Sequence, residues 1–249
     1  MRKLSLISKT YIAAVVMLGA AALVNSIVHW QQGRTGEFVA LLAMTLAASR
    51  LRVKLPRING IMSVNLPFLL IVAVRLGSGA LPIAALAGLV QSIPTAKKRP
   101  TLVQGIFNFA TITNAVAATS LIYSFVSQRG LVLPLSIAAA AAVFFVANTL
   151  PIALVLWLAE GENPLKAWQG MARLSAPYYT LSAGVAAIVC TATQFALWGE
   201  TLACLPLMYA IYNSYRVYFA APAETAVTAE NKPVARVGVD AASASAAVH

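Results

Sequence analysis

The chain has 249 residues, of which 60% are hydrophobic and only 10% are charged, and its mean hydropathy is +0.79. A soluble domain carries about 25% charged residues because its surface faces water, so this composition excludes an ordinary soluble fold and indicates an integral membrane protein. The net charge of +11 would suggest nucleic-acid binding in a soluble protein. Here the cations cluster between apolar runs, as membrane topology requires, and we expect no nucleic-acid partner.

Long apolar runs divide residues 1–220 into candidate transmembrane helices, because a bilayer core of about 30 Å needs about 20 apolar residues in a helix. The Ala-rich runs lack the alternation of a lipid-facing β-barrel, so we predict an all-α bundle. The eight predicted spans lie near residues 10–29, 36–50, 62–77, 79–95, 102–126, 132–158, 174–196 and 199–219. The second to fourth are short, which leaves open whether they cross fully. Only GSGA (77–80) separates the third from the fourth, so a re-entrant hairpin is an alternative for this pair.

The two ends of the chain differ in character. The N-terminal run has the basic start and apolar centre of a signal peptide, but it stays apolar to about Val28, and we expect an uncleaved first transmembrane helix. Residues 221–249 are rich in small residues, interrupted by polar ones and aperiodic. Such a segment cannot bury enough apolar area to offset the cost of ordering, so we expect a disordered cytoplasmic tail.

The cations predict the orientation of the bundle. If the N-terminus is cytoplasmic, eight spans place 15 of the 18 Lys and Arg residues inside. The outer three are Arg34, Arg75 and Arg129. Cationic loops resist translocation, so both termini are predicted to be cytoplasmic. The segment with the highest density of cations, SRLRVKLPRING (49–60), is then predicted to form a turn at the lipid headgroups. Binding of a partner or an anionic ligand by this segment is an alternative.

Few residues suit catalysis or metal binding. All seven acidic residues fall in predicted loops, span ends or the tail, and His29 lies near the end of the first span. We therefore expect no catalytic centre, metal or cofactor, and no carboxylate proton relay through the bilayer. Cys190 and Cys204 flank a short predicted outer turn and are either buried small residues or, if their helix faces match, a disulfide.

Uncharged polar residues within the spans are the candidates for a ligand site. Three of them recur at i, i+4 and i+7, which places them on one face of a helix, and residue counting puts the others at similar depth. The candidate ligand-binding residues are Asn65, Gln91, Gln104, Asn108, Thr111 and Asn148. Amides in hydrocarbon need partners, so the group should face the bundle interior, either to fix helix packing or to line a pocket or solute path. Pro151 predicts a kink in the sixth span.

Five segments resemble the membrane-embedded N-terminal sensor region of certain bacterial cyclic-di-GMP signalling proteins. In chain order they are SRLRVKLPRINGIMSVN, KKRPTLVQGIFNFA, FFVANTLPIALVLWLAEG, SAPYYTLSAGVA and LPLMYAIYNSYRVYF, and the resemblance covers roughly residues 38–218. The resemblance implies a bacterial inner-membrane location and a role in signal input, and it identifies no ligand. In that family a diguanylate cyclase or an HD-type phosphodiesterase domain follows the last span. This sequence has neither a GGDEF-type motif nor an HD pair, so its signalling would require another protein.

The leading hypothesis is therefore a stand-alone, non-enzymatic membrane sensor or small-ligand-binding module that signals through a partner protein. Its expected partners are membrane lipids, a small or lipophilic ligand and a signalling protein. A small-solute transporter, or the substrate-binding subunit of an uptake system, is the first alternative. No convincing internal repeat relates residues 1–125 to 126–219, which weighs against a carrier. A membrane assembly or interaction protein without a ligand is the second alternative.

Overall fold

The computed structural model describes most of the residues before position 193. The described residues are 5–30, 35–54, 61–93, 101–161 and 163–192, together with Pro206, Tyr209, Ala210 and Tyr212–Ser214. Most of the eighth predicted span, Cys204 with the question of a disulfide to Cys190, and the predicted tail lie outside the described residues. The helices are α1 (Leu6–Val28), α2 (Thr35–Arg50), α3 (Leu66–Leu76), the 3₁₀ helix η1 (Gly77–Ala80), α4 (Leu81–Ser92), α5 (Leu102–Gln128), α6 (Leu133–Glu160) and α7 (Pro164–Ala192).

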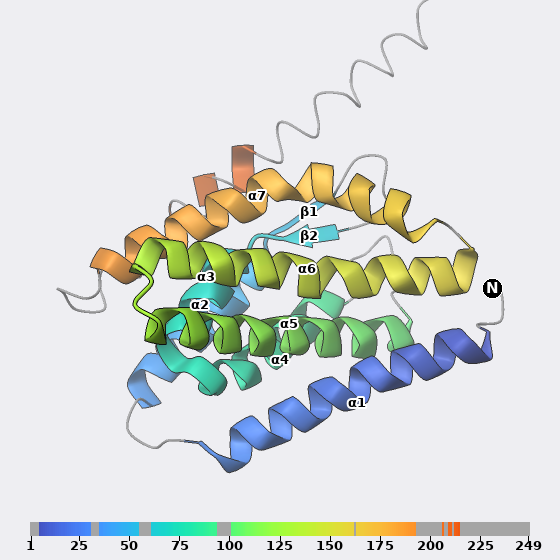
Figure 1. Cartoon of the computed structure of the whole chain (residues 1–249), viewed down its shortest axis with the longest axis horizontal. Helices are drawn as coiled ribbons and strands as arrows, with labels where there is room; N and C mark the ends of the chain where they lie inside the picture. The colour runs from blue at the N-terminus through green and yellow to red at the C-terminus, as the bar shows by residue number, and fades with distance from the viewer. Residues whose placement is uncertain are drawn as a thin grey trace, which may run out of the picture.

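The long helices form a bundle in which α5 and α6 lie side by side, α7 arches over them and α1 crosses obliquely below (Figure 1). Five stretches have the helical length and apolar composition to cross a membrane, namely α1, Leu66–Ser92 (α3, η1 and α4 counted together), α5, α6 and α7. The chain therefore has the composition and helix lengths of a multi-pass membrane protein. The first, fifth and sixth predicted spans coincide with α1, α5 and α6, whereas α7 begins well before the predicted start at residue 174.

The third and fourth predicted spans form a hairpin of two short helices. α3 has 11 residues and α4 has 12, so at 1.5 Å per residue each is only about 17 to 18 Å long, too short to cross a 30 Å bilayer core. The α3 helix ends at Gly77. Its φ of 55° and ψ of −124° are accessible to glycine but costly for residues with a side chain. Contacts at both ends of α3 show that it runs antiparallel to α2, because Asn65 meets the end of α2 while Arg75 meets its start.

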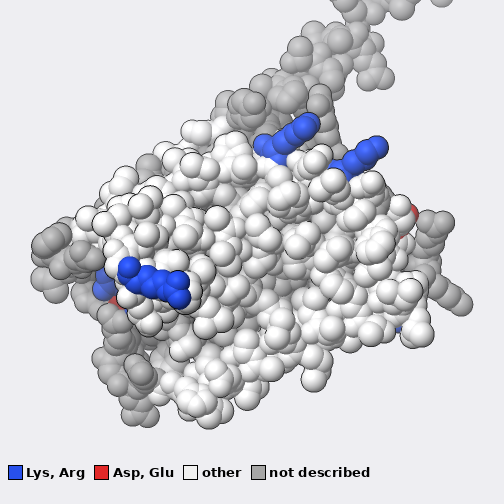
Figure 2. Space-filling model, in the orientation of Figure 1, with Lys and Arg blue, Asp and Glu red and all other residues white. Residues whose placement is uncertain are grey.

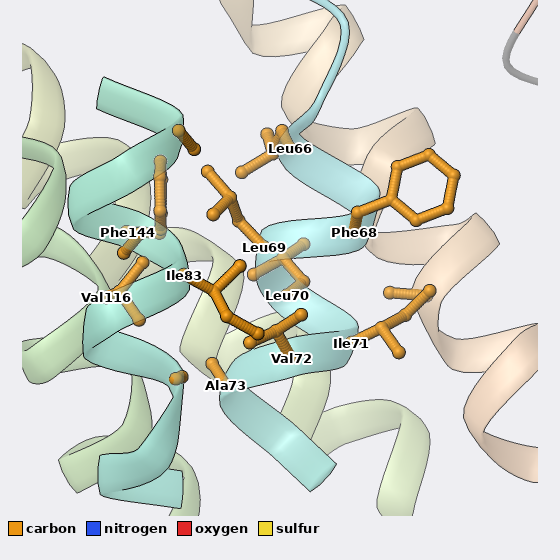
Figure 3. Close-up of a cluster of buried hydrophobic side chains, with 14 of the residues drawn as sticks. Leu66, Phe68, Leu69, Leu70, Ile71, Val72, Ala73, Ile83, Val116 and Phe144 are labelled. Carbon is orange, nitrogen blue, oxygen red and sulfur yellow. The ribbon is translucent and has the colours of Figure 1, made fainter. Parts of the chain in front are cut away.

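α3 lies at the centre of the core. Its residues from Leu66 to Ala73 are all buried, and Leu70, Ile71 and Val72 have no exposed surface. Figure 3 shows these side chains radiating in every direction, with Ile83 of α4 beside them and Phe68 pointing away from α4. A helix that is apolar all round is buried all round. In lipid such burial gains from close packing rather than from leaving water, so the fit of these side chains stabilises the bundle.

Two glycines bring helix backbones close together. A Cβ on Gly88 of α4 would lie 2.9 Å from the Cα of Phe109 in α5, and one on Gly19 of α1 would lie 3.1 Å from the Cα of Ala110. Small residues at crossing points allow this approach, which is how membrane helices gain packing energy. α5 is therefore held on two sides by backbone contact.

Contacts at the two ends of the bundle show that the helices alternate in direction. At one end, Ser26 of α1 and Ser120 of α5 donate to the carbonyls of Ser78 and Gly77 in η1. At the other, Ser8 of α1 donates to the carbonyl of Leu158 in α6. The latter is the end predicted to be cytoplasmic. Lys and Arg gather towards the ends and one edge of the molecule, and the face seen in Figure 2 is otherwise broadly uncharged.

The architecture is all-helical as predicted, apart from one short pair of strands. β1 (Arg52–Lys54) pairs antiparallel with β2 (Ile61–Ser63), and Arg52 lies opposite Ser63. Leu and Val alternate with cations here, a pattern that is typical of a strand and that the predicted turn at the lipid headgroups leaves out of account. The predicted turn at Pro56 to Gly60 lies outside the described residues.

Candidate functional site: the tyrosine pair of α7

Two long helices contain an internal proline, Pro151 in α6 and Pro177 in α7. A proline lacks the backbone N–H that would bond to the carbonyl four residues earlier, so each of these helices is weakened at that turn. Two tyrosines, Tyr178 and Tyr179, follow Pro177 directly. Consecutive helical residues point about 100° apart, so these two side chains reach different neighbours.

Tyr178 joins α7 to the start of α3. Its side chain is only 2% exposed, and its hydroxyl accepts the N–H of Leu66 at 3.1 Å and donates to the carbonyl of Ser63 at 3.1 Å. The first N–H groups of a helix need partners, and Asn65 at the N-cap gives none from its side chain. The Tyr178 hydroxyl therefore serves as the cap of α3, from a position 112 residues further along the chain.

The buried amide of Asn65 fixes the same junction to α2. Its Nδ2 donates to the hydroxyl oxygen of Ser49 at 2.8 Å, and that hydroxyl donates to the carbonyl of Thr45 at 2.7 Å. The hydroxyl of Ser63 donates to the carbonyl of Ser49 at 3.1 Å. The end of α2, the end of β2 and the start of α3 are thus held as one unit, which we call the hairpin junction (Ser49, Ser63 and Asn65).

Tyr179 joins α7 to α6. Its hydroxyl accepts from Nδ2 of Asn148 at 2.9 Å, and its ring meets that of Phe145 edge-on at 4.9 Å between centroids. The residue after Asn148 makes a second link, because the hydroxyl of Thr149 accepts the indole N–H of Trp168 at 3.0 Å. Asn148 and Thr149 lie just before Pro151, so the weakened segments of α6 and α7 are cross-linked by polar side chains.

The six candidate ligand residues do not converge on one place. Asn65 and Asn148 lie on either side of the tyrosine pair, Asn65 in the hairpin junction and Asn148 bonded to Tyr179. Asn108 instead joins α5 to α4, because its Nδ2 donates to the carbonyl of Gly88 and to the hydroxyl oxygen of Ser92, each at 3.3 Å. Gln91 is half-buried on α4.

Gln104 and Thr111 differ most from expectation. Gln104 is exposed at the start of α5, where its side chain accepts the N–H of Thr101 at 2.9 Å in a capping box, so it does not face the interior. The i, i+4, i+7 spacing lies on a helix as predicted, but that helix begins at Leu102 and its first turn uses polar side chains to cap itself. Thr111 is buried, and its hydroxyl has no hydrogen-bond partner within the described part of the chain.

An ion pair near the other end of the bundle was not expected. Arg75, at the end of α3, donates through Nε to the Glu37 carboxylate at the start of α2. The Glu37 side chain is only 6% exposed, and that of Arg75 is 28% exposed. Both residues lie at the predicted outer ends of their spans, Glu37 in 36–50 and Arg75 in 62–77. The signal that was missed is their position, because an acid and a base lie at the same predicted end of neighbouring apolar runs.

Comparison with protein-family models, curated proteins and solved structures gives no match. The candidate site is therefore inferred from the arrangement of its residues alone. Its groups are amides, hydroxyls and aromatic rings, which suit hydrogen bonding and stacking with a small molecule. The described residues contain no group of three or more His, Cys, Asp or Glu that could hold a metal ion.

A surface groove follows α1 from Met17 to His29 and is lined mostly by apolar side chains. It is open, lies on one helix, and none of the six candidate residues lines it. An apolar groove of this kind on a membrane helix suits contact with lipid chains.

Proposed function

We propose that the chain is a multi-pass sensor module of a bacterial inner membrane that binds a small or lipophilic molecule within its helical bundle and signals through a partner protein. This follows the resemblance to the sensor regions of cyclic-di-GMP signalling proteins, with both termini on the cytoplasmic side. The observation that carries it is the tyrosine pair. Tyr178 and Tyr179 connect the hairpin junction to the interior of the α6–α7 pair through adjacent positions on one helix.

The proposed output is movement of the cationic hairpin. A ligand that prefers one arrangement of α6 and α7 shifts the population of that arrangement. Because Tyr178 and Tyr179 are adjacent in α7, directly after Pro177, a shift of Tyr179 also moves Tyr178 and with it the cap of α3. The β-hairpin after α2 belongs to the predicted cytoplasmic loop, where a partner protein can detect the change.

The proposed site includes Asn148 and the side chains around it. A ligand hydroxyl or carbonyl can replace the Tyr179 hydroxyl as partner of the Asn148 amide, while Phe145 and Trp168 offer ring faces. Asn108 is a second candidate position, between α4 and α5.

The test is native mass spectrometry of the gently purified full chain with its co-purifying small molecules. We expect a stoichiometric adduct that is lost in Asn148→Leu and retained in Asn25→Leu, a matched change on the exposed face of α1. Asn108→Leu reports whether the second position takes part. Wild-type protein that carries only bulk lipid, or an adduct that persists in both the Asn148 and Asn108 variants, would contradict the proposed pocket.

A small-solute carrier is the second candidate, and the broken segment α3–η1–α4 favours it. Helices that break within the bundle are typical of the substrate sites of secondary transporters. The two functions separate in sealed vesicles that contain the purified chain. A carrier accumulates or exchanges the molecule found by mass spectrometry across the vesicle membrane, whereas a sensor binds it without net movement.

A further inference from the structure

The first third of α7 carries a cationic face. Lys166, Gln169, Gly170 and Arg173 are all exposed, and their spacing of three or four residues places them on one side of the helix. We call these four residues the α7 cationic strip. A Cβ on Gly170 would meet nothing within 4 Å, so the middle of the strip is open.

Neither cation of the strip pairs with an acidic residue that the structure describes. Within the part of the chain that the structure describes, no ion pair joins Lys166 or Arg173 to a carboxylate. Two turns separate them, a rise of about 10 Å, which their long side chains can bridge to reach one anion between them. An unpaired Lys and Arg flanking an amide provide several donors for phosphate oxygens.

The opposite face of α7 holds the strip in place. Trp168, two residues after Lys166, points the other way and is fixed to α6 by its hydrogen bond to Thr149 and by ring contact with Phe145 at 5.9 Å. The start of the helix is capped, because Oδ1 of Asn163 accepts the N–H groups of Leu165 and Lys166 at 3.0 and 3.2 Å. The strip therefore lies on a capped helical segment that is held to α6 along its inner face.

Exposed apolar side chains lie at the same end of the α6–α7 pair as the strip. Leu165 is 60% exposed, and Trp157, near the adjoining end of α6, is 47% exposed. Tryptophan at a helix end is typical of the membrane interface. α7 is 29 residues long, about 43 Å, so it exceeds a 30 Å hydrocarbon core and its surplus length falls in the headgroup layer.

We propose that the α7 cationic strip binds the phosphate of an anionic phospholipid headgroup, with the acyl chains lying along the exposed apolar residues beside it. The cations match the charge of such a lipid, and the neighbouring Trp157 and Leu165 match its apolar part, which a soluble phosphate lacks. This binding does not depend on the proposed sensor function.

The experiment counts lipids bound to the purified full chain by native mass spectrometry, in detergent with equal amounts of phosphatidylglycerol and phosphatidylcholine. Wild-type protein retains phosphatidylglycerol preferentially. A basic residue near a membrane surface contributes about fivefold to anionic-lipid binding, so Lys166→Gln with Arg173→Gln reduces the preference by roughly 25-fold. Arg129→Gln is the matched control. Arg129 is an exposed cation in the α5–α6 turn, at the start of α6, whereas the strip adjoins the other end of α6. The exchange Lys166→Arg with Arg173→Lys, which keeps both charges, retains the preference.

Four results would overturn the proposal: no lipid preference in the wild-type protein, an undiminished preference in the double Gln variant, an equal loss in Arg129→Gln, or displacement of the lipid by millimolar inorganic phosphate. An equal loss of lipid preference in Arg129→Gln would show that the preference depends on the net charge of the protein. Displacement of the lipid by phosphate would show that the strip binds a soluble anion. Thermal unfolding of each variant in the same detergent establishes that it is folded. If the double variant is unfolded, Arg173→Gln alone provides the test and reduces the preference by about fivefold.

Discussion

The hydroxyl of Tyr178 in α7 accepts the N–H of Leu66 at 3.1 Å and so caps a helix that begins 112 residues earlier in the chain. The same hydroxyl donates to the carbonyl of Ser63. One phenol oxygen thus satisfies one backbone donor and one backbone acceptor where β2 meets α3. The start of the most buried helix of the bundle depends on a side chain from α7, far along the chain.

Tyr178→Phe tests this dependence. The change keeps the ring but leaves the Leu66 N–H and the Ser63 carbonyl without this partner, and an unsatisfied buried group costs about 1 to 3 kcal/mol. We expect a loss of that size in unfolding free energy, measured by titration from mild into denaturing detergent. Tyr11→Phe is the control, because no hydrogen bond to the Tyr11 hydroxyl is found among the described residues. An equal loss in both variants would contradict the capping role.

Gly88→Ala tests the close approach of α4 and α5. The added Cβ would lie 2.9 Å from the Cα of Phe109, so the two backbones must separate, and overpacking of this kind costs about 1 to 3 kcal/mol. Gly184→Ala in α7 is the matched control, because its Cβ would meet nothing within 4 Å and alanine favours a helix by up to about 1 kcal/mol. The prediction is wrong if Gly88→Ala is as stable as Gly184→Ala in thermal unfolding.

Glu37→Gln tests the ion pair between α2 and α3. Removing the carboxylate leaves Arg75 partly buried without its counter-charge, and we expect a loss of about 1 to 3 kcal/mol, below that of a fully buried pair because Arg75 can reach water. Adding Arg75→Met removes the stranded charge and should restore part of the loss. A double-mutant cycle on unfolding free energies measures this coupling, and strictly additive losses would show that the two side chains act independently.

The apolar runs predicted the long helices well because a membrane span requires both length and apolar composition, and α1, α5 and α6 follow those runs closely. The same criterion was weak where helices are short. Hydropathy left residues 62–95 open between two short spans and a re-entrant hairpin, and Gly77 with the lengths of α3 and α4 gives a hairpin. Hydropathy does not distinguish a side chain that faces lipid from one that faces protein, because both surroundings are apolar.

Residue counting along the helices predicted the site only in part. It identified Asn65 and Asn148 as amides that need partners, and the structure supplies those partners, but it named neither tyrosine among the candidate residues. Tyr178 and Tyr179 matter because of which helix each one meets, and this depends on tertiary packing. The sequence signal that was available is a pair of tyrosines directly after a proline inside an apolar run.

The central claim is that the interior of the α6–α7 pair is coupled to the hairpin junction through the tyrosine pair. Hydrogen–deuterium exchange of the purified full chain tests it most directly. In Asn148→Leu, the loss of the bond to Tyr179 should increase exchange in peptides that cover Ser63 to Leu69, by about tenfold if the Tyr178 cap is weakened by about 1.4 kcal/mol. Asn25→Leu should leave those peptides unchanged. An increase confined to α6 and α7, with the Ser63 to Leu69 peptides at wild-type protection, would contradict the coupling.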